Sequence, residues 1–385
     1  MSDAASTGTG PGGGAGGRPP LATALARGPL VLDGGLSNQL QAAGHDLSDD
    51  LWSARLLAEH PDAVRAAHRA YYEAGADVVI TASYQATFEG FARHGIDAVS
   101  TAELLRLSVN LAREAAGQTG AGRTDAGAAG AGPAGAGPAS AGATGASPAS
   151  ASPASASPAG ASPASAGATG ASPAGAGRPL WVAASAGPYG AMLADGSEYR
   201  GDYGLSVTAL ERFHRPRLEV LADAAPDVLA LETVPDTDEA RALLRAVRGL
   251  GVPAWLSYSV SGTRTRAGQP LTEAFALAAD ADEIIAVGVN CCDPRDADTA
   301  VPLAARITGK PVVVYPNSGE TWNPTTHDWQ GPHRFTAQQV TAWYEAGARL
   351  IGGCCRVGPE TIRRVAEELR DVSARPAFED EAEGR

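Results

Sequence analysis

IIAVGVNC (residues 284–291) and RLIGGCC (residues 349–355) are two short apolar runs that each end in cysteine. A continuous apolar run of this length is typical of a strand that is buried on both faces of a parallel sheet. The ends of two such strands can bring their thiols to one soft metal ion. Three thiolates with an open fourth position predict a catalytic zinc site, because structural zinc sites are closed by four protein ligands.

Similar runs recur along the chain, and segments with helical periodicity separate them. We expect eight strands, at Pro29–Asp33, Asp77–Thr81, Leu180–Ala184, Asp227–Glu232, Ala254–Tyr258, Ile284–Asn290, Pro311–Tyr315 and Arg349–Gly353. Helices between them are expected at Pro61–Ala74, Thr101–Ala116, Val207–Ala222, Thr237–Gly249, Thr336–Ala346 and Pro359–Leu369. Strict alternation of strands and helices predicts parallel strands with right-handed crossovers.

Eight strand–helix units favour an α/β fold with a single (β/α)8 barrel of the TIM type. A doubly wound open sheet is the alternative, and it normally carries a glycine-rich phosphate loop after its first strand. Here Asp33-Gly34-Gly35 follows the first expected strand, and this segment is too short for that loop. The barrel is therefore the predicted fold.

A low-complexity segment interrupts the expected barrel. Residues 126–177 contain only Ala, Gly, Pro, Ser and Thr, so they cannot bury enough apolar surface to offset their ordering entropy. We expect a disordered insert at 117–178 between barrel segments 21–116 and 179–371, with a disordered tail at 1–20 and an acidic tail at 372–385. The insert precedes the third strand, and that connection lies on the N-terminal face of a barrel, away from the catalytic face.

The amino-acid composition argues against some classes of binding partner and indicates a cellular compartment. The 385-residue chain has 30 Lys and Arg against 43 Asp and Glu, and this net charge of −13 argues against a nucleic-acid or anionic-membrane partner. No run is long and apolar enough to span a bilayer, and the first 20 residues lack the apolar core of a secretory signal. Four cysteines in such a chain indicate reduced thiols in a cytoplasm and not a secreted disulfide framework.

Polar residues follow the expected strands at their C-terminal ends, which is where barrel enzymes keep their active sites. Asp33 ends the first strand, Thr81 the second, Glu232 the fourth and Asn290 the sixth. Two acids from different strands could flank the ammonium group of an amino acid bound across the barrel mouth. Alternatively, a carboxylate at the end of a strand often caps the helix that follows.

The predicted metal ligands are Cys291, Cys354 and Cys355. Their thiols can lie close together because a single strand separates the sixth and eighth strands of a closed barrel. Cys292 is expected to point the opposite way and to be structural. A substrate thiol as the fourth ligand would be deprotonated by the metal and would become a nucleophile near neutral pH. A buried apolar role for each thiol and a disulfide between the adjacent cysteines are the alternatives.

Two long loops are expected at the catalytic face, at 187–204 and 317–335. Acidic and aromatic residues in them could accept a cationic donor through charge and cation–π contacts. Trp322 and Trp329 could equally pack the second loop onto the barrel. An asparagine, Asn290 or Asn317, could fill the open metal position without substrate.

DGG at 33–35, GVNC at 288–291 and GGCC at 352–355 together resemble the zinc-dependent homocysteine S-methyltransferases. The resemblance covers almost all of the chain outside the insert and the two tails. TASYQAT at 81–87, the 194–203 segment and YPNSGE at 315–320 are more similar to the branch that uses S-methylmethionine than to the branch that uses betaine. The uncharged insert is the departure from the family pattern.

The resemblance implies a β/α barrel that binds Zn2+ through Cys291, Cys354 and Cys355, with the homocysteine thiol as the fourth ligand. Asp33 and Glu232 match the acids that hold the amino group of homocysteine. The region that receives its carboxylate matches Thr81 and the backbone near Gly35 and Leu36, and Asn290 is counted with the substrate-binding residues. No catalytic residue is implied beyond the metal-bound substrate thiolate.

The implied reaction transfers a methyl group from S-methylmethionine, or less efficiently from S-adenosylmethionine, to homocysteine in one in-line displacement. Methionine is the product. Two alternatives remain: the same zinc–thiolate chemistry with betaine as donor or with another thiol or selenol acceptor, and a metal-free barrel that acts as a binding protein.

Overall fold

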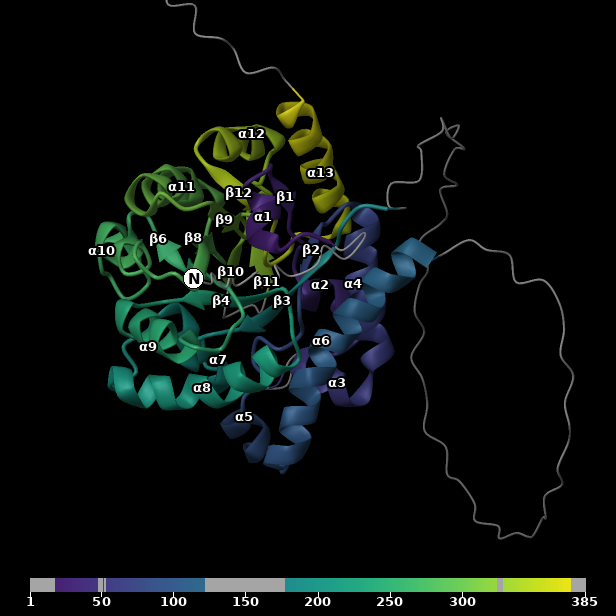
Figure 1. The fold of residues 1–385 in the computed structure, drawn as a ribbon, viewed down its shortest axis with the longest axis vertical. Helices are drawn as coiled ribbons and strands as arrows, with labels where there is room; N and C mark the ends of the chain where they lie inside the picture. The colour runs from purple at the N-terminus through teal and green to yellow at the C-terminus, as the bar shows by residue number, and fades with distance from the viewer. Residues whose placement is uncertain (1–17, 48–50, 52, 122–176, 324–327, 375–385) are drawn as a thin grey trace, which may run out of the picture. The chain divides into compact units, whose positions relative to one another are not determined.

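Eight parallel strands form the centre of the chain in a computed structural model, which describes residues 18–47, 51, 53–121, 177–323 and 328–374. Neighbouring strands pair in the order β1-β12-β9-β8-β5-β4-β3-β2. The sheet closes between β1 and β2, because the Asp33 N–H donates to the Val78 carbonyl at 3.0 Å and the Asp77 N–H donates to the Val31 carbonyl at 2.8 Å. The fold is a (β/α)8 barrel, as predicted (Figure 1).

Each barrel strand is followed by one long or medium helix. The strands are β1 (Leu30–Val31), β2 (Val78–Ile80), β3 (Trp181–Ala186), β4 (Val228–Val234), β5 (Ala254–Tyr258), β8 (Ile284–Asn290), β9 (Val312–Tyr315) and β12 (Ala348–Ile351). The helices that cover them are α4 (Pro61–Ala74), α6 (Ala98–Ala121), α8 (Val207–Asp223), α9 (Thr237–Val247), α10 (Leu271–Ala276), α11 (Pro294–Thr308), α12 (Ala337–Glu345) and α13 (Pro359–Ser373). All eight expected strands and six expected helices are therefore confirmed, with small shifts at their ends.

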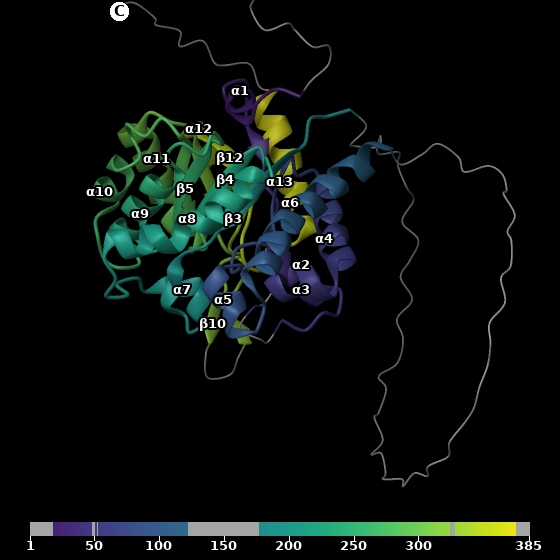
Figure 2. The same ribbon diagram turned by 60° about the horizontal axis from the view of Figure 1, so that its bottom comes forward.

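The additional elements lie in the connections that follow strands, with the exception of α1 (Leu21–Leu25). These elements are α2 (Leu36–Ala42), α3 (Ser53–Glu59), α5 (Phe88–Arg93), α7 (Tyr189–Leu193), the short 3-10 helix η1 (Ser197–Tyr199), and the hairpins β6–β7 (Val260–Ser261, Arg264–Thr265) and β10–β11 (Thr321–Asn323, Asp328–Gln330). Figure 2 shows α1 at one end of the barrel and α2, α3, α5, α7 and β10 at the other. The C-terminal end of the strands thus carries the extra structure, as catalytic faces of barrels do.

Two apolar layers stabilise the barrel. The inner layer fills the barrel with large and small side chains, for example Trp255 beside Ala230 and Ala286. Leu21 and Leu25 of α1 belong to the same inner cluster, so α1 closes the N-terminal end of the barrel. The outer layer lies between the strands and the surrounding helices and includes alternate strand residues such as Val287 and Val289.

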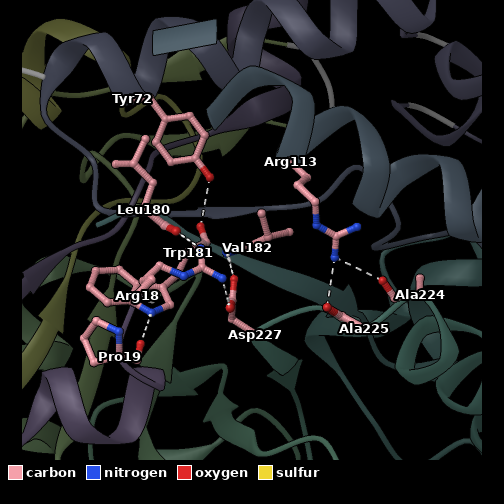
Figure 3. A network of polar contacts seen from close by, with 10 residues as sticks. All are labelled: Arg18, Pro19, Tyr72, Arg113, Leu180, Trp181, Val182, Ala224, Ala225 and Asp227. Atoms are coloured by element: carbon pink, nitrogen blue, oxygen red, sulfur yellow. Dashed lines mark hydrogen bonds and ion pairs between the residues drawn. The ribbon is translucent and has the colours of Figure 1, made fainter. Parts of the chain in front are cut away.

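The start of β3 is held at the N-terminal end of the barrel (Figure 3). The Arg18 guanidinium donates to the Leu180 carbonyl and pairs with Asp227, and the Trp181 indole N–H donates to the Pro19 carbonyl at 3.1 Å. The Tyr72 hydroxyl donates to the Trp181 carbonyl at 2.9 Å. These contacts connect residues 18–19, which were expected to belong to a tail, with the first strand residue after the low-complexity segment.

Some expected boundaries lie inside ordered structure. Helix α6 continues to Ala121, beyond the expected start of the insert, and α13 continues to Ser373, beyond the expected start of the acidic tail. Residues 122–176 lie outside the described ranges, so the insert stays a prediction. Within the described ranges, no helix combines the length and the apolar character needed to cross a bilayer.

Glycine is required where β8 meets β9. A Cβ atom added at Gly288 would lie 1.7 Å from the Val313 carbonyl oxygen, far inside van der Waals contact. The two strands pair directly at this position, since Gly288 is in register with Val313. The glycine therefore allows the strand that carries the first cysteine to approach its neighbour.

We predict that Gly288→Ala destabilises the protein by about 3 kcal/mol, because the added methyl group must push β8 away from β9. Calorimetry should show a fall in Tm of roughly 6–12 °C. Gly28→Ala is the matched control, since a Cβ at Gly28 meets nothing within 4 Å. An unchanged Tm for Gly288→Ala would contradict the close approach.

Candidate metal centre and active site

Three cysteines meet at the C-terminal end of β8, β9 and β12. Cys291 directly follows β8, and its N–H donates to the Tyr315 carbonyl at the end of β9 at 3.3 Å. Cys354 follows β12, and its N–H donates to the Pro316 carbonyl at 2.7 Å. Strand β9 thus lies between the two cysteine segments and bonds to both, which brings together thiols that are far apart in the sequence.

The sulfur positions fit a single tetrahedral metal ion. The Sγ atoms of Cys291, Cys354 and Cys355 lie within 4.8 Å of one another, and those of Cys291 and Cys355 are 4.0 Å apart. Ligands of a tetrahedral zinc ion at Zn–S distances near 2.3 Å are separated by about 3.8 Å. Cys291 is buried, whereas Cys354 and Cys355 are half-buried, so the group is reached from one side. The donor set is that of a zinc site with three protein ligands.

Backbone contacts fix the cysteine loops. The Cys355 N–H donates to Asn317 Oδ1 at 3.1 Å, and the Cys355 carbonyl accepts from the Ser318 N–H at 3.0 Å. Cys291 and Arg356 have left-handed backbones, with φ of 48° and 62°. Such a conformation is rare for residues other than glycine and is kept here by the surrounding bonds. The thiols are therefore held in position by the protein before any ion binds.

The three thiols also share protons. Hydrogen bonds from Cys291 and Cys354 lower the pKa of the Cys355 thiol well below its usual value. The pKa of Cys354 is raised in turn by its hydrogen bonds to Cys291 and Cys355. A set of thiols that can lose protons only one at a time is suited to a bound cation, which would allow all three to ionise.

Cys292 differs from these three residues, as expected. It is fully buried in the outer apolar layer, together with Val287 and Val289, and burial raises the pKa of its thiol. Its position provides an internal control for the metal hypothesis. All four cysteines are free thiols, so the alternative of a disulfide between neighbours is not adopted.

Asp33 and Glu232 point into the same end of the barrel from β1 and β4. Asp33 is 1% exposed, and its Oδ2 accepts from the Ile80 N–H at 2.9 Å, while its Oδ1 is buried with no hydrogen-bond partner among the described residues. Burial raises the pKa of Asp33 well above its usual value, and the charge of Glu232 raises it further. Asp33 thus offers an unused oxygen atom toward a second carboxylate.

The carboxyl of Glu232 belongs to a buried polar group that sequence reasoning missed. It accepts a short hydrogen bond from the Ser185 hydroxyl and interacts with the Tyr315 hydroxyl, which accepts from the Trp255 indole N–H at 3.1 Å. Burial raises the pKa of Glu232 to about 7. Ser185 interrupts the apolar run WVAASA of β3, and that interruption was the available signal.

Thr81 is connected to the same group. Its hydroxyl accepts from the Ser185 N–H at 3.0 Å and shares a hydrogen bond of 2.7 Å with the Ser83 hydroxyl. The residue is 3% exposed. Thr81 and Glu232 are therefore bridged by Ser185, which joins the ends of β2, β3 and β4.

Asn290 holds the end of β4. Its Oδ1 accepts from the Thr233 N–H and from the Ser257 hydroxyl, each at 2.8 Å, and its Nδ2 donates to the Thr233 hydroxyl at 2.8 Å. Thr233 needs this support, since its φ of 59° is left-handed. The amide oxygen of Asn290 accepts two bonds from protein groups, which occupy both of its lone pairs, whereas that of Asn317 accepts one bond, from the Cys355 N–H.

Gly35 and Leu36 lie where β1 turns into α2. The Gly35 N–H donates to the Val357 carbonyl at 2.9 Å, and its own carbonyl accepts from the Tyr71 hydroxyl at 3.0 Å. A Cβ at Gly35 would lie 2.7 Å from the Cys354 carbonyl oxygen. The turn is thus packed directly against the loop that carries two of the cysteines.

The loop after β3 brings Glu198 and Tyr199 toward the thiols. The Tyr199 hydroxyl interacts with the Cys291 thiol and lowers its pKa, although the residue as a whole is 38% exposed. The Arg266 guanidinium lies over the Tyr199 ring, 5.6 Å from its centroid. In the other long loop, Trp322 and Trp329 pair across the β10–β11 hairpin, but their side chains lie outside the described set.

The sequence has relatives over nearly its whole length. Residues 30–369 match the model of the homocysteine S-methyltransferase family. Homocysteine S-methyltransferase 4 of Zea mays is 40% identical over 357 residues, which cover 90% of this chain and 91% of the relative. Homocysteine S-methyltransferase YbgG of Bacillus subtilis is 36% identical, over 89% of this chain and 95% of the relative. The selenocysteine Se-methyltransferase of Brassica oleracea is also 36% identical, over 91% of each chain.

Solved structures agree with this relationship. The metallated form of the homocysteine methyltransferase MmuM from Escherichia coli superposes with a TM-score of 0.70 at 36% identity, covering 91% of this chain and 99% of MmuM. The presence of a metallated form of that enzyme is consistent with the three-cysteine group described above.

We predict that Cys291→Ala loses bound zinc, because two thiolates cannot replace a three-thiolate site. Elemental analysis of the purified protein should show zinc falling from about one ion per chain to a small fraction of that value. Cys292→Ala is the matched control and should keep its zinc, since its thiol points away from the group. Full zinc content in Cys291→Ala would rule out the site.

Proposed function

Since the chain belongs to the homocysteine S-methyltransferase family, we propose that it transfers a methyl group from S-methylmethionine or S-adenosylmethionine to the thiol of homocysteine at a zinc site. The observation that carries this proposal is the convergence of Cys291, Cys354 and Cys355 at one end of the barrel, with their sulfur atoms within 4.8 Å of one another. Bound zinc would supply an ionised substrate thiol near neutral pH.

Thiolate ligands favour zinc over harder ions such as Mg2+ or Ca2+. Three sulfur ligands and a tetrahedral preference leave one coordination position for the homocysteine sulfur atom. Asn290 does not compete for it, because its amide oxygen accepts two bonds from protein groups. The protein arrangement therefore supports a site that is completed by substrate.

We assign the ammonium group of homocysteine to Asp33 and Glu232. Both carboxyls are buried, and the charge of Glu232 raises the pKa of Asp33, so a cation placed between them would relieve their burial and repulsion. Asp33 Oδ1 has no protein partner among the described residues and is suited to accept an N–H. Ser185 orients Glu232 through its hydroxyl, and Asn290 holds the backbone that follows Glu232.

The homocysteine carboxylate would then face Thr81 and the turn at Gly35 and Leu36. The backbone that starts α2 offers polar hydrogens on this side of the barrel mouth, whereas the Thr81 hydroxyl donates to the Ser83 hydroxyl, whose own hydrogen goes to the Ser185 carbonyl. This arrangement would hold the amino acid by its charged end and direct its sulfur atom toward the cysteines. Positioning of this kind accelerates a displacement by aligning the reacting atoms.

The proposed methyl transfer needs no general acid or base. The bond between the methyl carbon and the sulfonium sulfur of the donor breaks as the bond to the homocysteine sulfur forms, with the three atoms in line. The donor sulfur keeps the electron pair of the broken bond, so a thiolate and a sulfonium become two neutral thioethers. No proton moves in this step, which agrees with the lack of a required general acid or base.

The acceptor could extend to a selenol, since one relative is named a selenocysteine Se-methyltransferase. A selenolate is a softer and more nucleophilic zinc ligand than a thiolate, and the same three cysteines would bind it. Betaine as donor is the less favoured alternative, on the motif similarity stated above. We further propose that the segment 122–176 stays outside the active site and that the enzyme works in a reducing cytoplasm.

The test is an assay of zinc-loaded protein with homocysteine and, separately, S-methylmethionine, S-adenosylmethionine or betaine. We expect methionine from the sulfonium donors, with S-methylmethionine the faster, and Cys291→Ala should form none. Selenocysteine replaces homocysteine in a parallel reaction. Turnover with betaine alone would reject the proposed donor, and no methionine from any donor at full zinc content would reject the proposed reaction.

The raised pKa of Glu232, about 7, makes a second prediction. Below pH 7 the carboxyl is protonated and loses its attraction for the ammonium group, so the KM for homocysteine should rise as pH falls from 8 to 6. Glu232→Gln should raise this KM at pH 8 by about 30-fold or more, since it leaves a buried charge without its partner. In the variant the pH dependence should be flatter, and any slope that remains reports the other titrating groups, Asp33 and the substrate thiol. Equal slopes in both proteins would contradict the role of Glu232.

A further inference from the structure

Glu198 is a buried carboxylate that the proposed reaction does not yet use. It lies in η1 (Ser197–Tyr199), on the loop that follows β3, and is 8% exposed. Its Oε2 is buried and has no hydrogen-bond partner among the described residues. A carboxylate in this state is costly unless a cation or a proton compensates it.

The side chain lies close to the metal centre. Its charge acts on Cys355 and on the Tyr84 hydroxyl, and the charge of Cys291 acts on it in return. Desolvation by burial raises the pKa of Glu198 to about 7. The carboxyl of this residue is therefore near enough to the thiols for their charges to interact.

Glu198 is nevertheless not a ligand in the cysteine group. The acidic and sulfur atoms that lie within 4.8 Å of one another at this site belong to Cys291, Cys354 and Cys355, and the Glu198 carboxyl is not among them. It interacts with Cys291 and Cys355 through its charge without joining the group. The observation to explain is thus a buried carboxyl near the thiols, with one oxygen atom that has no hydrogen-bond partner among the described residues.

The loop holds Glu198 firmly. A Cβ at Gly190 would lie 2.4 Å from the Glu198 backbone nitrogen, so α7 packs directly on η1. The Ser197 N–H donates to Asp195 Oδ1 at 3.0 Å, and the Gly201 N–H donates to the Ser197 carbonyl at 3.0 Å. The backbone on both sides of Glu198 is therefore anchored, which keeps its carboxyl at a defined place.

We propose that the Glu198 carboxylate recognises the positive charge on the sulfonium sulfur of the methyl donor and so selects cationic donors. This inference rests on the proposed function, because it needs a sulfonium substrate. A sulfonium sulfur has no N–H or O–H to donate, so it is recognised by its charge, and a buried carboxylate whose Oε2 has no hydrogen-bond partner among the described residues can provide the opposite charge.

The neighbouring aromatic ring is less suited to this task. Arg266 already lies over the Tyr199 ring, at 5.6 Å from its centroid, and supplies a cation to one face of it. A donor cation on the same face would meet the positive charge of Arg266. The ionised carboxylate of Glu198 carries a negative charge and interacts with Cys291 and Cys355, so we assign the donor charge to it.

The kinetic signature follows from the reaction. The sulfonium charge is complete in the bound donor and decreases as the methyl group leaves, so its attraction to Glu198 is strongest before the transition state. Loss of the carboxylate should therefore weaken donor binding and raise the donor KM, with little loss of kcat. A residue that only supported the loop would change kcat, zinc content and homocysteine KM as well.

Glu198→Gln keeps the shape of the side chain and removes its charge. We expect the KM for S-methylmethionine to rise about 10-fold or more, because one charge–charge contact is lost. The kcat should stay within about twofold of the wild-type value, and the KM for homocysteine should not change. Calorimetry without homocysteine should show the same rise in Kd for S-methylmethionine but not for methionine, whose sulfur is uncharged. Glu198→Asp should restore part of the affinity.

Asp202→Asn is the matched control, because it removes one negative charge from the same loop at an exposed side chain with a left-handed backbone that asparagine tolerates. It should leave every constant unchanged. An active wild-type enzyme whose donor KM is the same in Glu198→Gln overturns the inference alone. A zinc-loaded wild-type enzyme that takes no methyl group from either sulfonium donor overturns both this inference and the proposed function.

Discussion

The close approach of β8, β9 and β12 is the constraint on which the site depends. Parallel pairing aligns the C-terminal ends of these strands, and Gly288 removes the side chain that would separate β8 from the Val313 carbonyl. The Tyr315 and Pro316 carbonyls then accept bonds from Cys291 and Cys354 on either side. Three thiols from two distant segments become neighbours because one strand lies between them. The three-cysteine group is thus a consequence of the pairing of β8, β9 and β12 more than of any local motif.

Several buried carboxyl groups lie at the barrel mouth, and the protein alone stabilises their charged forms poorly. Burial raises the pKa of Asp33, and it brings those of Glu232 and Glu198 to about 7. A carboxyl whose pKa is higher in the folded than in the unfolded protein contributes stability at pH values below its unfolded-state pKa of about 4.3. This contribution is lost as the pH rises through its folded-state pKa, which is near 7 for Glu232. At neutral pH and above, the empty site therefore carries uncompensated charge. Cationic substrate groups would offset that charge, which couples substrate binding to stability.

The sequence predicted the parts of this structure that depend on repeated local pattern. Each barrel strand is a buried apolar run, and the bounds of β5 and β8 coincide with the expected ones because turn residues limit those runs sharply. Helix α1 and η1 were missed, since five and three residues carry too little periodicity. The contact between Ser185 and Glu232 depends on the register of β3 against β4, and the burial of Glu198 depends on the path of a loop. Neither is encoded within a few residues, so only the assembled barrel reveals them.

The proposed site must hold two amino acids that are nearly alike and must let both products leave. Homocysteine and S-methylmethionine share the same ammonium and carboxylate ends, so they can be told apart only at sulfur. The acceptor sulfur is anionic when metal-bound and belongs at the cysteines, whereas the donor sulfur is cationic and belongs beside Glu198. Methyl transfer removes both charges in one step. The acceptor product is then a neutral thioether with weak affinity for zinc, and the donor product is a neutral thioether beside a carboxylate that no longer attracts it. The charges that select the substrates are therefore absent from the products, so the same groups that bind donor and acceptor favour release of methionine.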